Sequence, residues 1–325
     1  MKNIFDIIGD AKTVGIAGHI RPDGDCVGSC MALYNYLLKN REDLTVKVYL
    51  EYVDKKFNII KNVDQIDTGG YDGTVYDLFI SLDTASKDRL GFNQPFFDNA
   101  KQTACIDHHA SNEGYADFNH IVPGASSASE VLYELLDENV IDLSVAEPMY
   151  MGIAHDSGVF RFQSTTPRTM NIAARMMEKG VNVNRILEET FYRKSYNQMM
   201  ITAKIQSQTV LTMGGKCIYG YCTSDMMEEY GVTVNDLDAV IASIRKVDGV
   251  EVALFVYQLN ENKFKCSLRS KNFVDVSKIA VSFGGGGHVR ASGFDMEGNL
   301  EQVLELVLSK IEESFNSGEK SQKED

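Results

Sequence analysis

The sequence lacks the features of membrane, secreted and disulfide-bonded proteins. No apolar run approaches the roughly 18 residues that a membrane-spanning helix needs. Asp6 and Asp10 interrupt the N-terminal segment MKNIFDIIGDAK, where a signal peptide would need an unbroken apolar stretch. The six cysteines form no CxxC pair, and several lie in apolar stretches, which is typical of reduced packing residues. We therefore expect a cytoplasmic protein that does not associate with membranes.

Positive charge is also scarce. The 46 Asp and Glu residues outnumber the 32 Lys and Arg residues, which gives a formal net charge of −14. Long double-stranded nucleic acid normally requires a broad basic surface, so we do not expect it as a partner. A small anionic ligand held by a local positive centre, such as a metal ion, is compatible with this charge. The absence of a GxGxxG loop after the first predicted strand argues against an oxidoreductase with a nucleotide cofactor.

The chain is long enough for two domains, with 325 residues of which 44% are hydrophobic and 24% charged. Apolar segments in its first half are typical of buried strands, at 13–18, 44–50, 76–83 and 103–108, and periodic segments are typical of helices, at 26–39, 127–139 and 144–156. This alternation predicts an α/β domain with a mainly parallel sheet flanked by helices, and ligands gathering at the carboxyl ends of the strands. Asp25 is predicted as the N-cap of the first of these helices.

The pattern changes in the second half of the chain. Residues 167–208 are helical by pattern, and after them come strand segments at 209–213, 216–223, 250–259 and 263–270 with helices near 235–246 and 299–315. This predicts a smaller C-terminal α/β domain. We expect a catalytic domain at 1–190, a helical linker at 191–208, a substrate-binding domain at 209–316 and a disordered charged tail at 317–325.

Four loops place aspartate or histidine directly after an apolar element: GHIRPDGDCVGSC (18–30), FISLDTAS, TACIDHHAS and YMGIAHDSGVF. In a parallel sheet these loops would meet at one edge. Carboxylates that share a pocket repel one another unless they are protonated or bind a cation, so the pattern favours a metal site over unrelated turn and helix caps. Carboxylates and imidazoles without a thiolate suit Mn²⁺ or Mg²⁺ better than structural Zn²⁺.

Asp23 and Asp25 are separated by one residue. On an extended backbone their side chains would point in opposite directions, so each could bind a different ion. Two ions about 3.5–4 Å apart form the arrangement that activates water for attack on phosphorus. His120 and His155 are interpreted as packing or hydrogen-bonding residues, and GASSASE (124–130) as a helix N-terminus whose amides could alternatively assist a phosphate.

In this order, HIRPDGD, SLDTAS, DHH and HDSG resemble the four motifs of the DHH phosphoesterase superfamily. GGGGHVRASGF (284–294) resembles the signature of the DHH-associated C-terminal domain, so the resemblance spans nearly the whole chain. It is most similar to the branch of nanoRNases and pAp phosphatases, which degrade very short oligoribonucleotides and remove the 3′-phosphate of adenosine 3′,5′-bisphosphate. The resemblance implies a hydrolase with its active site between the two domains and two Mn²⁺ per site, for which Mg²⁺ or Co²⁺ could substitute.

The resemblance also implies a role for each motif residue. One ion would be held by His19 and Asp23, the other by Asp25, His108 and Asp156, with Asp83 bridging the two. Asp107 is expected to orient the neighbouring imidazole. His109 is expected to face the scissile phosphate, as a charge stabiliser or general acid.

A basic segment of the second domain is the candidate substrate clamp. Between residues 261 and 290 the net charge is +4, from six basic residues less two acidic ones: Lys263, Lys265, Arg269, Lys271, Lys278 and Arg290 against Glu261 and Asp275. The glycine run is predicted as flexible backbone whose amides approach an anion, with Arg290 as an adjacent donor. The resemblance implies that the nucleotide's terminal phosphate and sugar would contact Arg269, Ser270, Gly286, Gly287 and His288.

The expected substrate is a short single-stranded oligoribonucleotide or a mononucleotide bisphosphate, because a long strand would meet the acidic exterior. Three alternatives stay open. The enzyme could hydrolyse pApA or a cyclic dinucleotide, or it could be a pyrophosphatase or exopolyphosphatase. It could also be a nucleotide sensor without turnover, although the complete ligand set argues against this. A homodimer through the N-terminal domain is compatible with the sequence.

Overall fold

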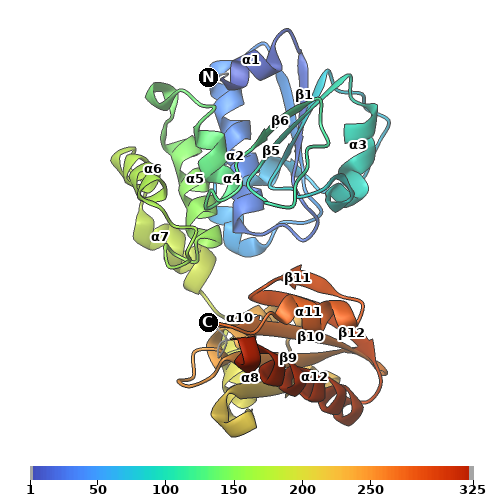
Figure 1. The fold of residues 1–325 in the computed structure, drawn as a ribbon. Coiled ribbons are helices and arrows are strands. Elements are labelled where there is room, and N and C mark those ends of the chain that lie inside the picture. Colours follow the sequence, from blue (N-terminus) through green and yellow to red (C-terminus); the bar gives the residue numbers. More distant parts are fainter. Residues whose placement is uncertain (1–2, 322–325) are drawn as a thin grey trace. The chain divides into compact units, whose positions relative to one another are not determined.

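The computed structural model describes residues 3–321, which form two compact units with a boundary between Arg193 and Lys194 (Figure 1). Each unit has a central sheet and its own hydrophobic core. No helix within residues 3–321 is long and apolar enough to cross a membrane.

The first unit is built on a six-stranded sheet in the order β3-β2-β1-β4-β5-β6. Its strands are β1 (Thr13–Ala17), β2 (Thr45–Tyr49), β3 (Ile66–Asp67), β4 (Leu78–Leu82), β5 (Gln102–Asp107) and β6 (Phe118–Ile121). All of these neighbours pair in parallel, which confirms the predicted parallel sheet. The order of the strands reverses between β1 and β4, and such a switch point is where ligands gather in open parallel sheets.

Helices cover both faces of this sheet. They are α1 (Ile4–Ile8), α2 (Gly24–Asn40), α3 (Gln94–Asn99), α4 (Ala128–Tyr133), α5 (Leu143–Asp156), α6 (Pro167–Glu178) and α7 (Val183–Leu187). Short 3₁₀ or π turns join them at η1 (Lys55–Ile59), η2 (Val63–Gln65), η3 (Lys87–Asn93), η4 (Glu138–Val140) and η5 (Glu188–Tyr192). Alternate residues of β4 face opposite sides, because Ile80 joins the core that includes α2 and α5 whereas Phe79 joins an aromatic cluster that includes α3.

Helix α2 carries two of the predicted ligands at its start. Asp23 is its N-cap, since the Asp23 carboxylate accepts hydrogen bonds from the amides of Asp25 and Cys26 at 3.0 and 3.1 Å. The prediction that Asp25 caps this helix is therefore wrong, because Asp25 lies inside the first turn. Helix α2 packs closely along α5, and a Cβ added at Gly28 would lie only 2.5 Å from the carbonyl oxygen of Pro148.

The second unit has a mixed sheet in the order β11-β12-β10-β9-β8-β7. Its strands are β7 (Val210–Thr212), β8 (Cys217–Cys222), β9 (Val252–Asn260), β10 (Lys263–Ser270), β11 (Gly286–His288) and β12 (Ala291–Glu297). Its helices are α8 (Tyr196–Ser207), α9 (Ser224–Tyr230), α10 (Asp238–Ile244), α11 (Val276–Ser282) and α12 (Leu300–Ser321), with turns η6 (Met213–Gly215) and η7 (Val234–Asp236). β8 and β9 pair in parallel and the other neighbours are antiparallel.

Three segments of the second unit differ from the sequence prediction. The glycine run, predicted as a flexible loop, contains strand β11, which pairs with β12. The segment predicted as a helical linker does form a helix, α8, but its Ile201 and Ile205 lie in a core cluster with Ile218 of β8, so this helix packs within the second unit. Helix α12 continues to Ser321, into the segment predicted as a tail, and residues 322–325 lie outside the described residues.

Candidate metal centre

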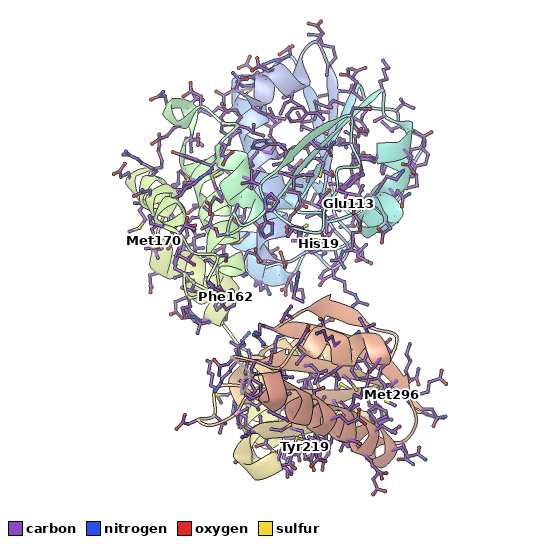
Figure 2. The ribbon with its side chains drawn as sticks, viewed as in Figure 1. His19, Glu113, Phe162, Met170, Tyr219 and Met296 are labelled. Carbon is purple, nitrogen blue, oxygen red and sulfur yellow. The ribbon has the colours of Figure 1, made fainter. Side chains whose placement is uncertain are left out.

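The carboxyl edge of the first sheet collects the predicted metal ligands. His19 lies two residues after β1, Asp83 directly follows β4, and His108 directly follows β5. Asp156 is the last residue of α5, and Asp23 and Asp25 lie at the start of α2. Figure 2 labels His19 at the lower edge of this sheet.

Asp83 lies between two imidazoles. Its carboxylate oxygens are 3.4 Å from Nε2 of His19 and 3.4 Å from Nε2 of His108, and its side chain is 4% exposed. The backbone of Asp83 adopts a left-handed conformation with φ of 52°, and its amide donates to the carbonyl of Ile106 in β5. Left-handed backbone is uncommon outside glycine, although aspartate tolerates it better than most residues. This turn places the Asp83 carboxylate between His19 on one side and His108 on the other.

His108 contacts Asp83 and also belongs to a second cluster of predicted ligands, formed with Asp25 and Asp156. Its Nε2 is also 3.3 Å from a carboxylate oxygen of Asp156, and donor atoms of Asp25, His108 and Asp156 all lie within 4.8 Å of one another. The Nδ1–H of His108 donates to the carbonyl of Ala125 at 3.1 Å. This hydrogen bond turns Nε2 toward the carboxylates, as metal-binding histidines require.

His19 and Asp23 form the opposite side of the cluster. Nε2 of His19 is 3.8 Å from the carboxylate of Asp23, and its Nδ1–H donates to the carbonyl of Ile20 at 2.7 Å. Asp23 and Asp25 point in different directions, as predicted, but for a different reason. Asp23 caps the helix from outside, whereas Asp25 projects from its first turn toward α4.

His109 is held by Asp107. Its Nδ1–H donates to the Asp107 carboxylate at 2.8 Å, and this hydrogen bond raises the pKa of His109 above its ordinary value. Asp107 is fully buried and accepts a second hydrogen bond, from the side-chain amide of Asn112 at 2.7 Å. The imidazole that Asp107 orients is therefore that of His109. Asn112 was not singled out by its sequence, because a lone asparagine in a loop carries no signal.

The charges of the cluster favour a bound cation. Burial and the charges of Asp83 and Asp156 raise the pKa of Asp25 well above its ordinary value, and burial raises the pKa of Asp156 to about 7. Burial also opposes ionisation of Asp83, but hydrogen bonds to His108 and His19 hold its pKa below the ordinary value. These carboxylates compete for negative charge in a buried space, and a divalent ion would let them all ionise. The donor set therefore fits a metal site.

The other two histidines of the first unit and the six cysteines occupy packing or hydrogen-bonding positions. His155 makes a hydrogen bond with Thr190 at 2.9 Å and makes edge-on ring contacts with Phe57 and Phe191. His120 lies 3.0 Å from Glu134. The six cysteines are buried, although Cys26 also lies within 4.8 Å of donor atoms of the metal cluster.

In the second unit, two predicted substrate contacts share one face of the sheet. Arg269 of β10 and His288 of β11 both pair with Ala291 of the intervening strand β12. Directly opposed residues of antiparallel strands project to the same face, so Arg269 and His288 lie on either side of Ala291. The guanidinium of Arg269 also donates to the carbonyl of Leu268 at 3.0 Å. Gly286 and Gly287 lie in the same exposed edge strand as His288.

Other parts of the predicted clamp have internal partners. The Ser270 hydroxyl is buried and donates to the carbonyl of Val274 at 2.6 Å, and Arg290 donates to the same carbonyl at 2.8 Å. Lys263 and Lys265 both pair with Asp295, which follows the segment used to count the local charge. This single carboxylate offsets one unit of the local positive charge.

Two family models match the chain, one in each unit. Residues 13–153 match the DHH family, N-terminal domain, and residues 214–317 match the DHHA1 domain. The chain is similar to the bifunctional oligoribonuclease and PAP phosphatase NrnA of Thermus thermophilus, with 29% identity over 309 residues that cover 92% of this chain and 89% of the relative. The protein of the same name from Bacillus subtilis is 26% identical over 286 residues, which cover 86% of this chain and 88% of the relative.

A solved structure shows the same fold. The exopolyphosphatase-related protein from Bacteroides fragilis superposes with a TM-score of 0.86 at 20% identity, covering 97% of this chain and 94% of that one. The predicted pair of a parallel-sheet domain and a smaller α/β domain is thereby confirmed. The motif resemblance is confirmed as well, and the chain belongs to the DHH family, with a DHH domain followed by a DHHA1 domain.

Proposed function

We propose that this chain is a phosphoesterase that hydrolyses short oligoribonucleotides and the 3′-phosphate of adenosine 3′,5′-bisphosphate. The main support is the position of Asp83 between His19 and His108 at the switch point of a parallel sheet. The relatives named for oligoribonuclease and PAP phosphatase activity align over most of the chain, which favours these substrates over others.

We propose two Mn²⁺ as the resident ions, with Asp83 as their shared ligand. One ion would be held by His19 and Asp23 and the other by Asp25, His108 and Asp156. When bound, such ions lower the pKa of a shared water and offset the charge that develops on the phosphate oxygens. Carboxylates and imidazoles are the donors that support Mn²⁺ or Mg²⁺ here.

His109 has the features of a general acid. Its Nδ1 is occupied by Asp107, so Nε2 is the atom left to contact a substrate. The same hydrogen bond raises its pKa, which favours the protonated imidazole. We propose that Nε2–H of His109 stabilises a non-bridging oxygen or gives its proton to the leaving oxygen, while Asp107 fixes the ring.

The second unit is the proposed nucleotide-binding part. Arg269 and His288, on one face of the sheet, would bind phosphate, and the edge amides of Gly286 and Gly287 would contribute further donors. The donors of Ser270 and Arg290 already bind the carbonyl of Val274, so we propose that these two residues act by holding the loop after β10.

A substrate panel tests the proposed function. Metal-stripped protein supplied with Mn²⁺ is incubated with pAp, pApA, a 5′-phosphorylated trinucleotide, cyclic di-AMP and pyrophosphate, and the products are resolved by chromatography. We expect hydrolysis of pAp and of the trinucleotide. Hydrolysis of pyrophosphate alone would overturn the proposed substrate class, and absence of turnover with Mn²⁺, Mg²⁺ and Co²⁺ would overturn the activity.

A further inference from the structure

The carboxylate of Asp25 is held by the start of helix α4. One of its oxygens accepts a hydrogen bond from the amide of Ala128 at 2.6 Å. The other accepts two from Ser129, one from the amide at 3.1 Å and one from the hydroxyl at 2.6 Å. Asp25 is 1% exposed and Ser129 is fully buried, so solvent does not compete for these hydrogen bonds.

The same short segment also holds a second predicted ligand. The carbonyl of Ala125, four residues before Ser129, accepts the Nδ1–H of His108 at 3.1 Å. Residues 125–129 therefore orient both Asp25 and His108, which the metal assignment places on one ion. Outer partners of this kind fix the direction of a metal ligand's lone pair.

The segment is itself anchored. The buried carboxylate of Glu130 accepts hydrogen bonds from the amide and hydroxyl of Ser126 and from the hydroxyl of Thr169 in α6, at 3.2, 2.5 and 2.8 Å. The hydroxyl of Ser127 accepts the amide of Glu130 at 3.0 Å and serves as the N-cap of α4. Ser127 therefore stabilises the helix without touching Asp25, whereas Ser129 touches Asp25 directly.

Helix α5 leaves no spare room around this contact. A Cβ added at Gly152 would lie 2.0 Å from the hydroxyl oxygen of Ser129 and 2.6 Å from Asp25 Oδ1. The side chains of Asp25 and Ser129 are thus enclosed between α4 and α5. A carboxylate has about four acceptor positions, and three are occupied by α4, which leaves about one for a ligand.

We propose that Ser129 is a positioning residue of the metal centre. Its hydroxyl and amide fix the Asp25 carboxylate so that the remaining acceptor position faces the ion shared with His108 and Asp156. This inference rests on the proposed function only in taking Asp25 as a metal ligand. Ser129 should therefore affect metal affinity, whereas a serine that only caps the helix, such as Ser127, should not.

The test compares two neighbouring buried serines. Ser129→Ala and Ser127→Ala proteins are stripped of metal and titrated with Mn²⁺ by calorimetry, and their melting temperatures are measured. We expect Ser129→Ala to weaken one Mn²⁺ site by about 10- to 100-fold, the range that loss of an outer hydrogen bond produces. Ser127→Ala should lower the melting temperature, because the helix cap is lost, and leave both Mn²⁺ affinities unchanged.

A double variant shows whether Ser129 acts through Asp25. In an Asp25→Asn background, Ser129→Ala should cause no further loss of Mn²⁺ affinity, because the carboxylate that it orients is gone. Gly152→Ala supplies a second way to displace the pair and should reproduce the loss at one Mn²⁺ site.

Three results would overturn the proposal: unchanged Mn²⁺ affinity in Ser129→Ala, an equal loss in Ser127→Ala, or an undiminished effect in the Asp25→Asn background. The calorimetric comparison does not depend on turnover. If the protein binds Mn²⁺ but hydrolyses none of the panel substrates, the proposed function fails while the role of Ser129 is still decided.

Discussion

Asp83 is the residue on which the proposed metal centre depends most. Its carboxylate contacts imidazoles from two different strand ends, and its backbone adopts the left-handed conformation. A non-glycine residue in that conformation costs on the order of 1–3 kcal/mol and is commonly retained at functional sites.

Replacing Asp83 by asparagine should abolish most of the activity. Loss of an outer hydrogen-bond partner already costs about 10- to 100-fold in metal affinity or activity, so loss of a shared ligand should exceed about 100-fold in both. Asp77 offers a matched control, because it precedes strand β4 while Asp83 follows it, and it binds Lys101 and the amide of Lys12. Asp77→Asn should reduce stability and leave Mn²⁺ affinity unchanged. Calorimetry measures the Mn²⁺ affinity of each variant, and hydrolysis of pAp measures its activity. Normal turnover in Asp83→Asn would rule out Asp83 as the shared ligand.

Protons would compete with a bound metal ion for Asp156 and His108, two of the proposed ligands. Burial raises the pKa of Asp156 from 3.8 to about 7. Burial opposes protonation of His108, but its hydrogen bond to Asp83 and the nearby carboxylates raise its pKa from 6.5 to about 10. Because both pKa values are raised by folding, each group stabilises the metal-free protein at low pH, and that contribution is lost as the pH rises through the folded-state pKa.

Bound metal replaces these protons, so its stabilising effect should increase with pH. We expect the rise in melting temperature caused by Mn²⁺ to be larger at pH 8 than at pH 6. Thermal unfolding with and without Mn²⁺ across this range measures the difference. A rise that is constant or that shrinks toward pH 8 would contradict the assignment of these groups as ligands.

The sequence predicts strand-end residues better than their supporting partners. Asp83 and His108 follow apolar runs, so their position at one sheet edge can be inferred from the chain alone. Ser129 cannot be identified in this way, because its partner Asp25 is 104 residues away and GASSASE has the pattern of a helix start. Ser127 is indeed the cap that this pattern predicts, and nothing local distinguishes it from Ser129.

At the scale of elements, long apolar strands are predictable and short polar ones are not. β1, β4 and β5 are almost wholly buried and appear as apolar runs. β3 has two residues, β6 contains Asn119 and His120, and β11 is part of a glycine run. Their strand conformation comes from pairing with a neighbour, which composition does not encode.

Strand β11 provides a prediction at this scale. Gly287 has φ of +136°, and a Cβ there would lie 2.6 Å from the carbonyl of Ala291, whereas a Cβ at Gly286 would meet nothing within 4 Å. Gly287→Ala should therefore destabilise the second unit by about 1–3 kcal/mol and lower its melting temperature by several degrees. Gly286→Ala should be close to neutral, and neither should change Mn²⁺ affinity. Equal melting temperatures for the two variants would contradict the described edge strand.

At the scale of the whole molecule, the net charge of −14 opposes long nucleic acids. Asp295 pairs with two lysines of the basic segment in the second unit, and the excess of acidic residues in the chain would repel the phosphates of a long strand.

Turnover should accordingly be faster for a dinucleotide than for an oligonucleotide of about 24 residues. The difference should narrow as salt is added, because screening weakens the repulsion between the strand and the acidic surface. The difference in turnover is measured as the rate of product release from the two substrates at matched concentrations. Equal rates at low salt would contradict a preference set by charge.

The central claim is that divalent ions join side chains from distant parts of the chain into one hydrolytic centre. Anomalous X-ray scattering from crystals grown with Mn²⁺ tests it most directly. We predict two peaks at the carboxyl edge of the first sheet, both within coordination distance of Asp83, one beside His19 and one beside His108. Peaks located elsewhere, or no peak beside Asp83 in crystals that contain Mn²⁺, would contradict the account.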